Sequence, residues 1–255
     1  MILEGNETIH SYIEEYFSDD LLKALYLVAM DNSYPNNNVK AQKILDLIGP
    51  DFQELGPGTN RVVVKRDKAV FKIAMDRRGM VDNFTEFKRS PEVEMYCAKT
   101  YECNLLITVA EYVNLMDEQD YLANRGAILT ILEDLSKVYV FEDMGYNMIN
   151  RCNTGYRDNG DIVFLDYGYM YPITGNENAL ICKACGAMVG YNSTYTKFVC
   201  SNPSCKKQYR FSQIRNRMNL SLENEEDAII TNINALKTPD WNNLNKEAYT
   251  NGLLK

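Results

Sequence analysis

The spacing of apolar side chains divides the chain into helical and extended stretches. Near the N-terminus they recur every three or four residues, which predicts one or two helices within 7–31 and another over 39–48. From residue 55 the pattern changes to strand-type residues bounded by turns. It predicts strands over 62–65, 69–74, 96–102 and 105–113, with the apolar stretch 105–110 inside a sheet.

Two further helices are predicted between and after these strands. The first covers 83–90 and stops at Pro91, which lacks the backbone N–H that a helix needs. The extended connector 111–114 leads to the second, a long amphipathic helix over 120–140. The side chains of this helix that are predicted to face the core are Ile128, Leu129, Ile131, Leu132, Leu135 and Val138.

A hairpin follows the long helix and brings two polar side chains together. Residues 154–157 and 161–165 are of strand type, and Asp158-Asn159-Gly160 between them is typical of a tight turn. Asn153 and Asp166 flank the two strands, so we expect them at neighbouring ends of the hairpin. An amide oxygen and a carboxylate placed in this way can share a Mg²⁺ ion. An ordinary hairpin with a polar end is the alternative interpretation.

Composition narrows the class of protein. A chain of 255 residues can bury one large core or two modest ones, and it has no apolar run of the ~20 residues that cross a bilayer. Its first residues lack the basic start and apolar core of a signal peptide. Seven cysteines, an odd number, favour a reducing cytoplasm over secretion. His10 is the only histidine, so acid–base chemistry is expected to fall to carboxylates.

Charge is distributed unevenly along the chain. The net charge of −8 argues against nucleic-acid binding by the whole surface. Residues 180–222, however, contain no acidic residue and seven basic ones, which leaves 20 basic and all 35 acidic residues to the rest of the chain. The seven basic residues are Lys183, Lys197, Lys206, Lys207, Arg210, Arg215 and Arg217.

The same basic segment contains four cysteines in two close pairs. Cys182 and Cys185 are separated by fourteen residues from Cys200 and Cys205. This spacing predicts a structural four-thiolate zinc site of zinc-ribbon type, with the strand-type residues 191–199 as ribbon strands. Disulfides and buried free thiols are the alternatives. The cysteines outside the motif, interpreted as packing residues, are Cys97, Cys103 and Cys152.

The charge and composition of this module indicate what it can bind. Four thiolates on Zn²⁺ carry a charge of −2, so the local basic excess falls to about +5. Aromatic residues lie among the basic ones, a composition compatible with nucleic acid or with an acidic protein face. These aromatic residues are Tyr191, Tyr195, Phe198, Tyr209 and Phe211.

A glycine-containing turn precedes the first strand pair. Gly56 and Gly58 lie before the strand at 62–65, and Lys72 lies on the strand after it. Glycine lets backbone amides approach phosphates, and a strand lysine suits a phosphate or a buried carboxylate such as Glu86. A plain hairpin with a solvated lysine, and a solvated helix glutamate, are the alternatives.

The order of these features resembles the protein-kinase-like fold, especially the compact kinase-like proteins encoded by bacteriophages. The resemblance covers about residues 50–175 and rests on a glycine loop, strand lysine, helix glutamate, two strands, connector, long helix, asparagine loop, hairpin and Asp-Tyr-Gly, in that order. It implies that Gly56, Gly58 and Val63 belong to a phosphate loop, in which Arg61 replaces the third glycine.

The resemblance also implies roles for polar residues along the rest of this region. Lys72 would bind the α- and β-phosphates of ATP, and Glu86 would hold Lys72. Glu111 to Val113 would form the hinge beside the adenine ring. Asn153 and Asp166 would bind Mg²⁺.

The chain departs from the family pattern at the catalytic base. The family has an aspartate five residues before the metal-binding asparagine, and that position here is Met148, whose thioether cannot accept a proton. If Asn147 were the metal ligand instead, Glu142 would lie five residues before it and Asp143 four. The favoured register keeps Asn153 and predicts a damaged active site, in which Asp143 or Glu142 could supply a substitute base.

The predicted fold is therefore α+β: a protein-kinase-like bilobal fold with a reduced C-lobe, plus a zinc ribbon. The ribbon occupies the position where a kinase has its activation segment and substrate-binding lobe. The predicted domains are an N-terminal helical cap (1–50), an N-lobe with a sheet and one helix (51–114), a reduced C-lobe (115–178), the ribbon (179–217), and a C-terminal helix with a polar tail (218–255).

Three functions follow as hypotheses. The leading one is a kinase-like, nucleotide-binding or degenerate (pseudokinase-type) phage protein that acts through a protein partner, with the ribbon as contact module. The first alternative is an active Mg-ATP-dependent phosphotransferase, a protein or small-molecule kinase with Asp143 or Glu142 as base. The second is a virion or nucleic-acid-associated scaffold that binds through residues 180–217. All three predict no membrane association, and a location in the host cytoplasm or the virion.

Overall fold

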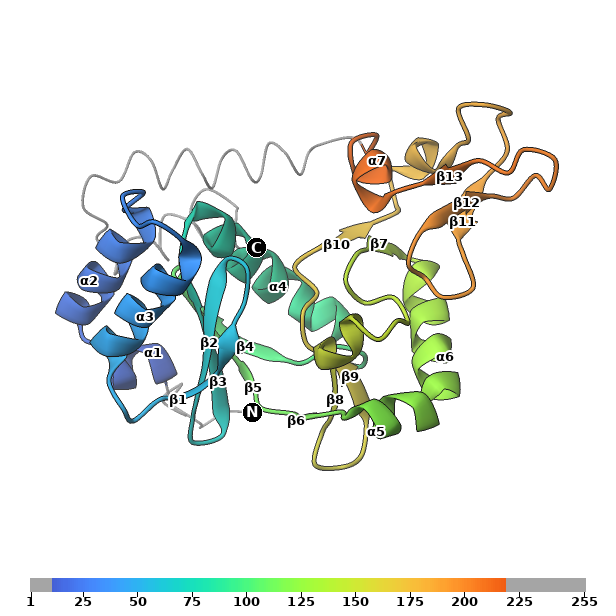
Figure 1. Ribbon diagram of the computed structural model, residues 1–255. Coiled ribbons are helices and arrows are strands. Elements are labelled where there is room, and N and C mark those ends of the chain that lie inside the picture. Colours follow the sequence, from blue (N-terminus) through green and yellow to red (C-terminus); the bar gives the residue numbers. More distant parts are fainter. Residues whose placement is uncertain (1–10, 219–255) are drawn as a thin grey trace, which may run out of the picture. The chain divides into compact units, whose positions relative to one another are not determined.

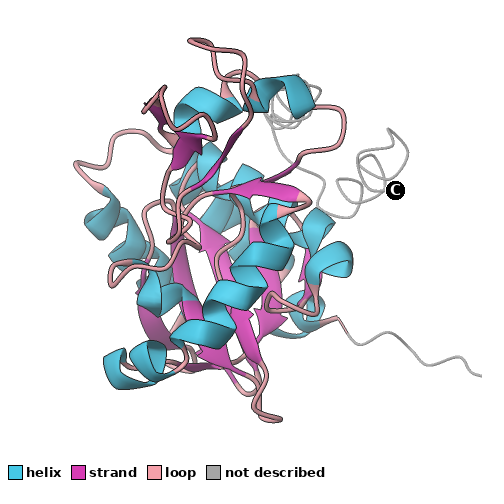
Figure 2. Cartoon of the chain, turned by 90° about the vertical axis from the view of Figure 1, so that its right-hand side faces the viewer, coloured by secondary structure: helices cyan, strands magenta, loops and turns pink. Residues whose placement is uncertain are grey.

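The protein, described by a computed structural model over residues 11–218, has a mixed α/β fold with several small antiparallel sheets (Figures 1 and 2). Within the described chain, unit 1 comprises 11–84 and 100–110, and unit 2 comprises 85–99 and 111–218. No helix in this part of the chain has both the length and the apolar character needed to cross a membrane.

Three predictions fall outside the described residues. They concern His10, and the C-terminal helix and the polar tail predicted within 218–255.

Unit 1 is built on a five-stranded sheet in the order β1-β2-β3-β5-β4. The predicted interior position of 105–110 is confirmed, because β5 lies between β3 and β4. The strand predicted over 96–102 is shorter than expected and begins only at Thr100. The strands are β1 (Gln53–Pro57), β2 (Arg61–Arg66), β3 (Ala69–Ala74), β4 (Thr100–Cys103) and β5 (Ile107–Glu111).

The N-terminal helices of unit 1 form as the apolar spacing predicts. They are α1 (Tyr12–Tyr16), α2 (Asp19–Met30) and α3 (Asn37–Ile48). Each begins with a side-chain cap, since Ser11, Ser18 and Asn36 each accept the N–H of the residue three positions later. The rings of Phe17, Phe52 and Phe71 lie with their centroids 5.3–5.6 Å apart and join these helices to β3.

Helix α4 (Arg77–Val93), in which the chain passes from unit 1 to unit 2, is longer than predicted at both ends. Asp76 caps its start, because its carboxylate accepts the Gly79 N–H at 2.8 Å. The helix continues past Pro91, so the prediction of a stop there is wrong. A proline in the last turn costs a hydrogen bond, which the burial of Val93 helps to offset.

Residues 120–140 of unit 2 form two helices and a strand, so the prediction of one long helix is wrong. The elements are α5 (Glu118–Ala123), α6 (Arg125–Ser136) and β7 (Tyr139–Phe141). Asn124 causes the break. Its Nδ2 donates to the Asp120 carbonyl at 2.8 Å and to the Tyr156 hydroxyl at 2.7 Å, and these bonds end α5 before α6 begins.

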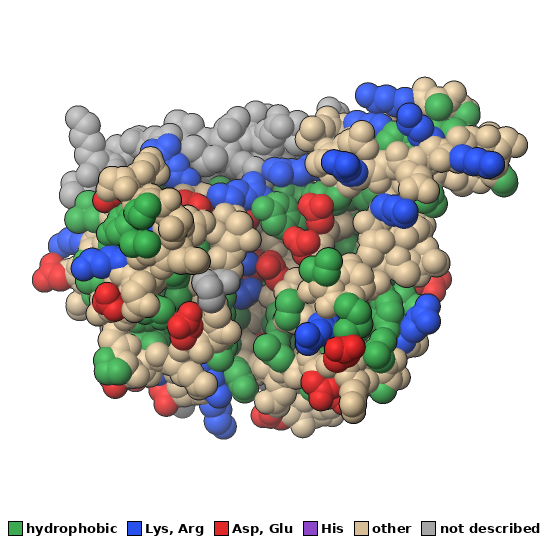
Figure 3. Space-filling view, in the orientation of Figure 1, with side chains coloured by type: hydrophobic (Ala, Val, Ile, Leu, Met, Phe, Trp, Pro, Cys, Tyr) green, Lys and Arg blue, Asp and Glu red, His purple; other side chains and the backbone are tan. Residues whose placement is uncertain are grey.

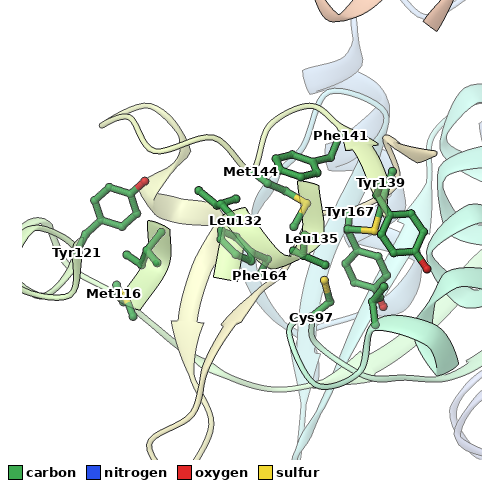
Figure 4. Close-up of a cluster of buried hydrophobic side chains, with 13 residues drawn as sticks. Cys97, Met116, Tyr121, Leu132, Leu135, Tyr139, Phe141, Met144, Phe164 and Tyr167 are labelled. Carbon is green, nitrogen blue, oxygen red and sulfur yellow. The ribbon is translucent and has the colours of Figure 1, made fainter. Parts of the chain in front are cut away.

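The first core of unit 2 gathers around α6 and β7 (Figure 4). Ile128, Leu132 and Leu135 are buried in it as predicted, and Leu129 and Ile131 pack against it. Val138 is 49% exposed instead, because it lies beyond the end of α6.

The predicted hairpin is confirmed as β8 (Thr154–Tyr156) and β9 (Ile162–Phe164), with β6 (Asn114–Leu115) as a third strand beside β8. Arg157 N–H donates to Asp161 O at 2.9 Å across the turn. Gly160 has a φ of +89°, a value that glycine adopts without strain. A short 3₁₀ helix, η1 (Asn150–Asn153), leads directly into β8.

The four-cysteine segment forms a three-stranded ribbon of β11 (Val189–Tyr191), β12 (Phe198–Cys200) and β13 (Gln208–Tyr209). Strand β10 (Met170–Pro172), paired with β7, and the 3₁₀ helix η2 (Glu177–Leu180) precede it, and α7 (Phe211–Arg215) follows. Of the predicted stretch 191–199, only the two ends are strand, and 192–197 form the turn between them.

Candidate functional site

Asn153 and Asp166 lie at neighbouring ends of the β8–β9 hairpin, as predicted. Leu165 N–H, next to Asp166, donates to Asn153 O at 2.9 Å. On the other side, Tyr167 is buried and its hydroxyl donates to Ala98 O at 2.7 Å. Asp166 is therefore held between two neighbours whose positions are fixed.

Asp143, in the loop that follows β7, is attached to the same asparagine. Asn153 Nδ2 donates to the main-chain carbonyl of Asp143 at 3.1 Å, across ten positions of sequence. Asp143 has a φ of +62°, a left-handed conformation that costs a non-glycine residue about 1–3 kcal/mol and is concentrated at functional sites. Within residues 11–218, the Oδ1 atom of Asn153 makes only a long contact, 3.9 Å, to the Cys152 thiol.

The carboxylates of this loop repel one another. Partial burial, together with the charge of Asp166, raises the pKa of Asp143 above its ordinary value. Burial and the charge of Asp143 raise the pKa of Glu142 as well, with Arg215 opposing the shift. A divalent cation relieves such repulsion, and oxygen ligands of this kind suit Mg²⁺.

The alternative ligand Asn147 is occupied within its own loop. Its Oδ1 accepts the N–H groups of Ile149 at 2.9 Å and Asn150 at 3.0 Å. The amide oxygen that a metal ion would need is thereby used by the backbone. Met148, in the same loop, is 40% exposed.

The predicted glycine turn of unit 1 connects β1 to β2. Gly56 lies at a bulge of β1 with a φ of +141°, which requires glycine. Gly58 N–H donates to Arg61 O at 2.8 Å, and a Cβ added to Gly58 would lie 3.2 Å from that oxygen. Val63, the other phosphate-loop residue, pairs with Lys72 in the β2–β3 register.

Lys72 and Glu86 are both buried, with exposed fractions of 8% and 0%. The plain alternatives, a solvated lysine and a solvated helix glutamate, are therefore wrong. Lys72 belongs to unit 1 and Glu86 to unit 2, and the ion pair between them stays a prediction.

Glu111 and Val113, the predicted hinge residues, are fixed within unit 2. The Glu111 carboxylate accepts from the Arg157 guanidinium at 2.7 Å and from the Lys99 N–H at 2.9 Å. The hydrogen bond to Glu111 raises the pKa of Arg157. Val113 is buried, so the connector is anchored at both positions.

The four cysteines of the ribbon converge as predicted. All four Sγ atoms lie within 4.8 Å of one another, with Cys182–Cys205 at 3.6 Å and Cys185–Cys200 at 3.4 Å. Tetrahedral coordination with Zn–S bonds of ~2.3 Å places sulfur atoms about 3.8 Å apart. The group can therefore hold a metal ion. All seven cysteines are free thiols, so the disulfide alternative is wrong.

Local turns and one tyrosine shape the thiol cluster. Gly186, at a φ of +73°, donates its N–H to Cys182 O at 2.9 Å and bends the first pair. The Tyr209 hydroxyl donates to Cys182 Sγ at 3.1 Å, and this hydrogen bond lowers the pKa of the Cys182 thiol, whereas burial raises the pKa of the Cys200 thiol. No feature of the sequence indicates this role of Tyr209.

The three remaining cysteines divide by burial. Cys97 and Cys103 are buried, in agreement with a packing role. Cys152 is exposed, so its interpretation as a packing residue is wrong.

The basic and aromatic residues of the ribbon have separate roles. Phe198, Tyr209 and Phe211 are buried in the ribbon core, so they offer no faces for base stacking. Figure 3 shows Lys and Arg side chains gathered over the ribbon. Five of them are exposed and form no ion pair within residues 11–218, namely Lys183, Lys197, Lys206, Lys207 and Arg210.

Comparison of the chain with protein-family models and with curated proteins finds no match. The function must therefore be argued from the geometry of these two sites, the Asp143–Asn153–Asp166 group and the four-cysteine group.

Proposed function

We propose that the chain is a kinase-like phosphotransferase that uses Mg-ATP, with Asp143 as general base. The observation that carries this proposal is the hydrogen bond from Asn153 to the Asp143 carbonyl, with Asp166 close enough to raise the pKa of Asp143. The loop 144–152 lengthens the sequence distance between base and asparagine but leaves them adjacent in space. This favours Asp143 over Met148 as the residue in the position of the base.

The residues of unit 2 support the roles of metal ligand and general base. Asn153 Oδ1 and the Asp166 carboxylate would hold Mg²⁺, which neutralises charge on the phosphates. Asp143 would take the proton of an acceptor hydroxyl while the acceptor oxygen bonds to the γ-phosphorus and the bond from that phosphorus to the β–γ bridging oxygen breaks, releasing ADP. The binding of the α- and β-phosphates by Lys72, which belongs to unit 1, stays a prediction of the kinase resemblance.

Three variants test the proposal. Asp143→Asn should retain Mg-ATP-dependent stabilisation in a melting assay but lower kcat by about 10²–10⁴-fold, the usual contribution of a general base. Asp166→Ala should lose the Mg²⁺ dependence of the stabilisation. Met148→Ala is the matched control in the same loop and should behave as wild type in both assays.

The outcomes separate the hypotheses. ADP production that survives Asp143→Asn would overturn the role of Asp143. Mg-ATP stabilisation of wild type without any phosphate transfer would favour the degenerate, partner-binding protein. The absence of both would leave the scaffold hypothesis.

The ion of the four-cysteine site is proposed to be one structural Zn²⁺. A closed set of four thiolates leaves no open position for a substrate, which is typical of structural zinc. Free thiols throughout the chain support a reducing compartment, and we place the protein in the host cytoplasm or in a virion assembled there.

The exposed basic face of the ribbon favours a second function, contact with an anionic partner. Exposed cations attract phosphates or acidic side chains, and three of the five ribbon aromatic residues, Phe198, Tyr209 and Phe211, are buried and cannot stack on bases. Substitution of Lys206, Lys207 and Arg210 by Gln should weaken salt-sensitive binding to duplex DNA or to a polyglutamate probe. The same change at the exposed Lys23, Lys43 and Lys68 is the control. Equal binding by both triple variants would exclude the ribbon as the contact surface.

A further inference from the structure

The ribbon contacts the chain on both sides of Asp143, at Phe141 before it and at Gly145 and Tyr146 after it. Before Asp143, the Tyr191 hydroxyl accepts the Phe141 N–H at 2.6 Å and donates to the Phe141 carbonyl at 2.8 Å. One side chain thereby satisfies both backbone groups of a β7 residue, as a neighbouring strand would. Phe141 lies two positions before Asp143, so this contact fixes where the loop begins.

The rings of Phe141 and Tyr191 reinforce the contact. They are stacked with centroids 4.8 Å apart and an interplanar angle of 19°. Burial raises the pKa of Tyr191, which keeps its hydroxyl protonated and able to donate and accept at the same time. Tyr191 also packs on Phe198 of β12, with centroids 4.1 Å apart.

At the other end of the loop, the turn 192–197 of the ribbon meets Gly145 and Tyr146. Tyr146 N–H donates to Thr194 O at 2.7 Å. A Cβ added to Gly145 would lie only 2.5 Å from Tyr195 O, so the two backbones touch and only glycine fits. Asn192 makes this turn rigid, because its Oδ1 accepts the N–H groups of Thr196 and Lys197.

The strand pair that carries Tyr191 also carries one of the four cysteines. Tyr191 pairs with Phe198 in the β11–β12 register, and Val189 pairs with Cys200, a predicted ligand. Small metal-binding domains commonly fold only when their metal is bound. We therefore expect the position of Tyr191 to depend on occupancy of the cysteine site.

We propose that the ribbon is a positioning module for the Asp143 loop, in which Tyr191 and the 192–197 turn hold residues 141–146 only while the four cysteines bind a metal ion. Asp143 has a strained backbone, and strain persists only where surrounding contacts enforce it. Tyr191 is thus a positioning residue that acts through Phe141. The catalytic consequence rests on the proposed phosphotransfer, whereas the structural coupling does not.

Tyr191→Phe tests the coupling in the full-length, zinc-loaded protein, since it removes the hydroxyl and keeps the ring stack. Hydrogen exchange of the Phe141 amide should accelerate by tenfold or more, while the zinc content stays at one equivalent. If transfer occurs in wild type, kcat should fall about 10-fold or more with KM for ATP changed by less than 3-fold. Tyr96→Phe is the matched control, because it removes a tyrosine hydrogen bond to Asp134 elsewhere in unit 2.

Gly145→Ala disturbs the contact between the loop and the 192–197 turn, and it serves as the second test if Tyr191→Phe folds poorly. It should accelerate exchange of the Tyr146 amide and lower kcat in the same way. Unchanged exchange at Phe141 in Tyr191→Phe, or an equal loss of kcat in Tyr96→Phe, would overturn the proposal. Coupled exchange in a protein that transfers no phosphate would retain the coupling and reject the proposed function.

Discussion

At the scale of single residues, Asp143 carries three features that oppose stability. Its backbone has a positive φ, its carboxylate is partly buried, and the charge of Asp166 lies close to it. The Asn153 side chain holds its carbonyl with a hydrogen bond of 3.1 Å. Residues that combine several destabilising features are typical of functional sites, because selection for stability alone would replace them.

Asp143→Asn should therefore stabilise the protein in the absence of divalent cations. The raised pKa means that the folded state binds more protons than the unfolded state, so Asp143 costs stability as the pH rises from near 3.8 through its folded pKa. At pH 7 we expect an increase in Tm of about 1–3 °C, kept small by solvent screening. The gain should vanish near pH 3, where both side chains are neutral.

Thermal melts of wild type and Asp143→Asn from pH 3 to pH 8 measure this difference. Addition of Mg²⁺ should shrink this difference if the ion binds beside Asp143, since the cation relieves the repulsion between Asp143 and Asp166, which only wild type has. A lower Tm for the variant throughout the range would show that Asp143 is a structural residue.

The residues of this site differ in how far the sequence alone could locate them. Asn153 and Asp166 were found because the hairpin that joins them is local, and its turn chemistry is explicit in Asp158-Asn159-Gly160. Spacing alone favours the register that passes through Met148 over Asp143, because counting residues assumes a loop of fixed length. The hydrogen bond between Asn153 and the Asp143 carbonyl crosses a longer loop, so residue spacing cannot predict it.

At the scale of elements, helix α4 shows how packing overrides a breaker residue. Pro91 removes one hydrogen bond and crowds the preceding turn, which costs up to about 3 kcal/mol inside a helix. Its position near the C-terminal end reduces this cost, and the burial of Val93 stabilises the continued helix. The sequence shows the proline, but it does not show that Val93, two residues later, is buried.

Pro91→Ala should raise the free energy of unfolding by about 1 kcal/mol. The substitution restores a backbone donor and relieves the crowding, against a loss of roughly 0.4–1 kcal/mol from the more flexible unfolded chain. Chemical denaturation of both proteins measures the change. Pro35→Ala, in the loop between α2 and α3, is the control and should lower stability slightly, because only the unfolded-state effect operates there. Destabilisation by Pro91→Ala would contradict this account of α4.

Asn124, in contrast to Pro91, interrupts a stretch that is predicted to be one continuous helix. Its side chain ends α5 by binding Asp120 O and, 32 positions away, the Tyr156 hydroxyl. Periodicity correctly identified which residues of α6 face the core, since three of them are buried. It could not detect the break, because the partner that fixes Asn124 comes from a distant strand.

At the scale of the whole molecule, strand β7 serves two cores of unit 2. Tyr139 and Phe141 belong to the core around α6, whereas Val140 between them belongs to the ribbon core. Alternation along one strand thus places the two cores on opposite faces of it. Neither the sharing nor the Tyr191–Phe141 contact, which spans 50 positions, could be inferred from the sequence.

Metal removal should consequently disrupt unit 2 without an equal effect on unit 1. Loss of the ion releases the four thiolates and with them the ribbon core, to which Val140 contributes. The amides of β7, β10 and the ribbon should lose protection in hydrogen exchange when the purified protein is treated with a chelator. Those of β2 and β3 should keep theirs, because the sheet of unit 1 has its own core of helices and aromatic rings.

Cys185→Ser should reproduce the effect of the chelator, and Cys152→Ser, which changes an exposed cysteine outside the cluster, should leave both metal content and protection unchanged. A parallel loss of protection in β2 and β3 would mean that the chain unfolds as one cooperative body. Full protection of the ribbon after metal loss would mean that the thiols are not its structural support. The expected result, a selective opening that begins at the cysteines and reaches the residues on either side of Asp143, would connect the two sites of unit 2 through a single strand.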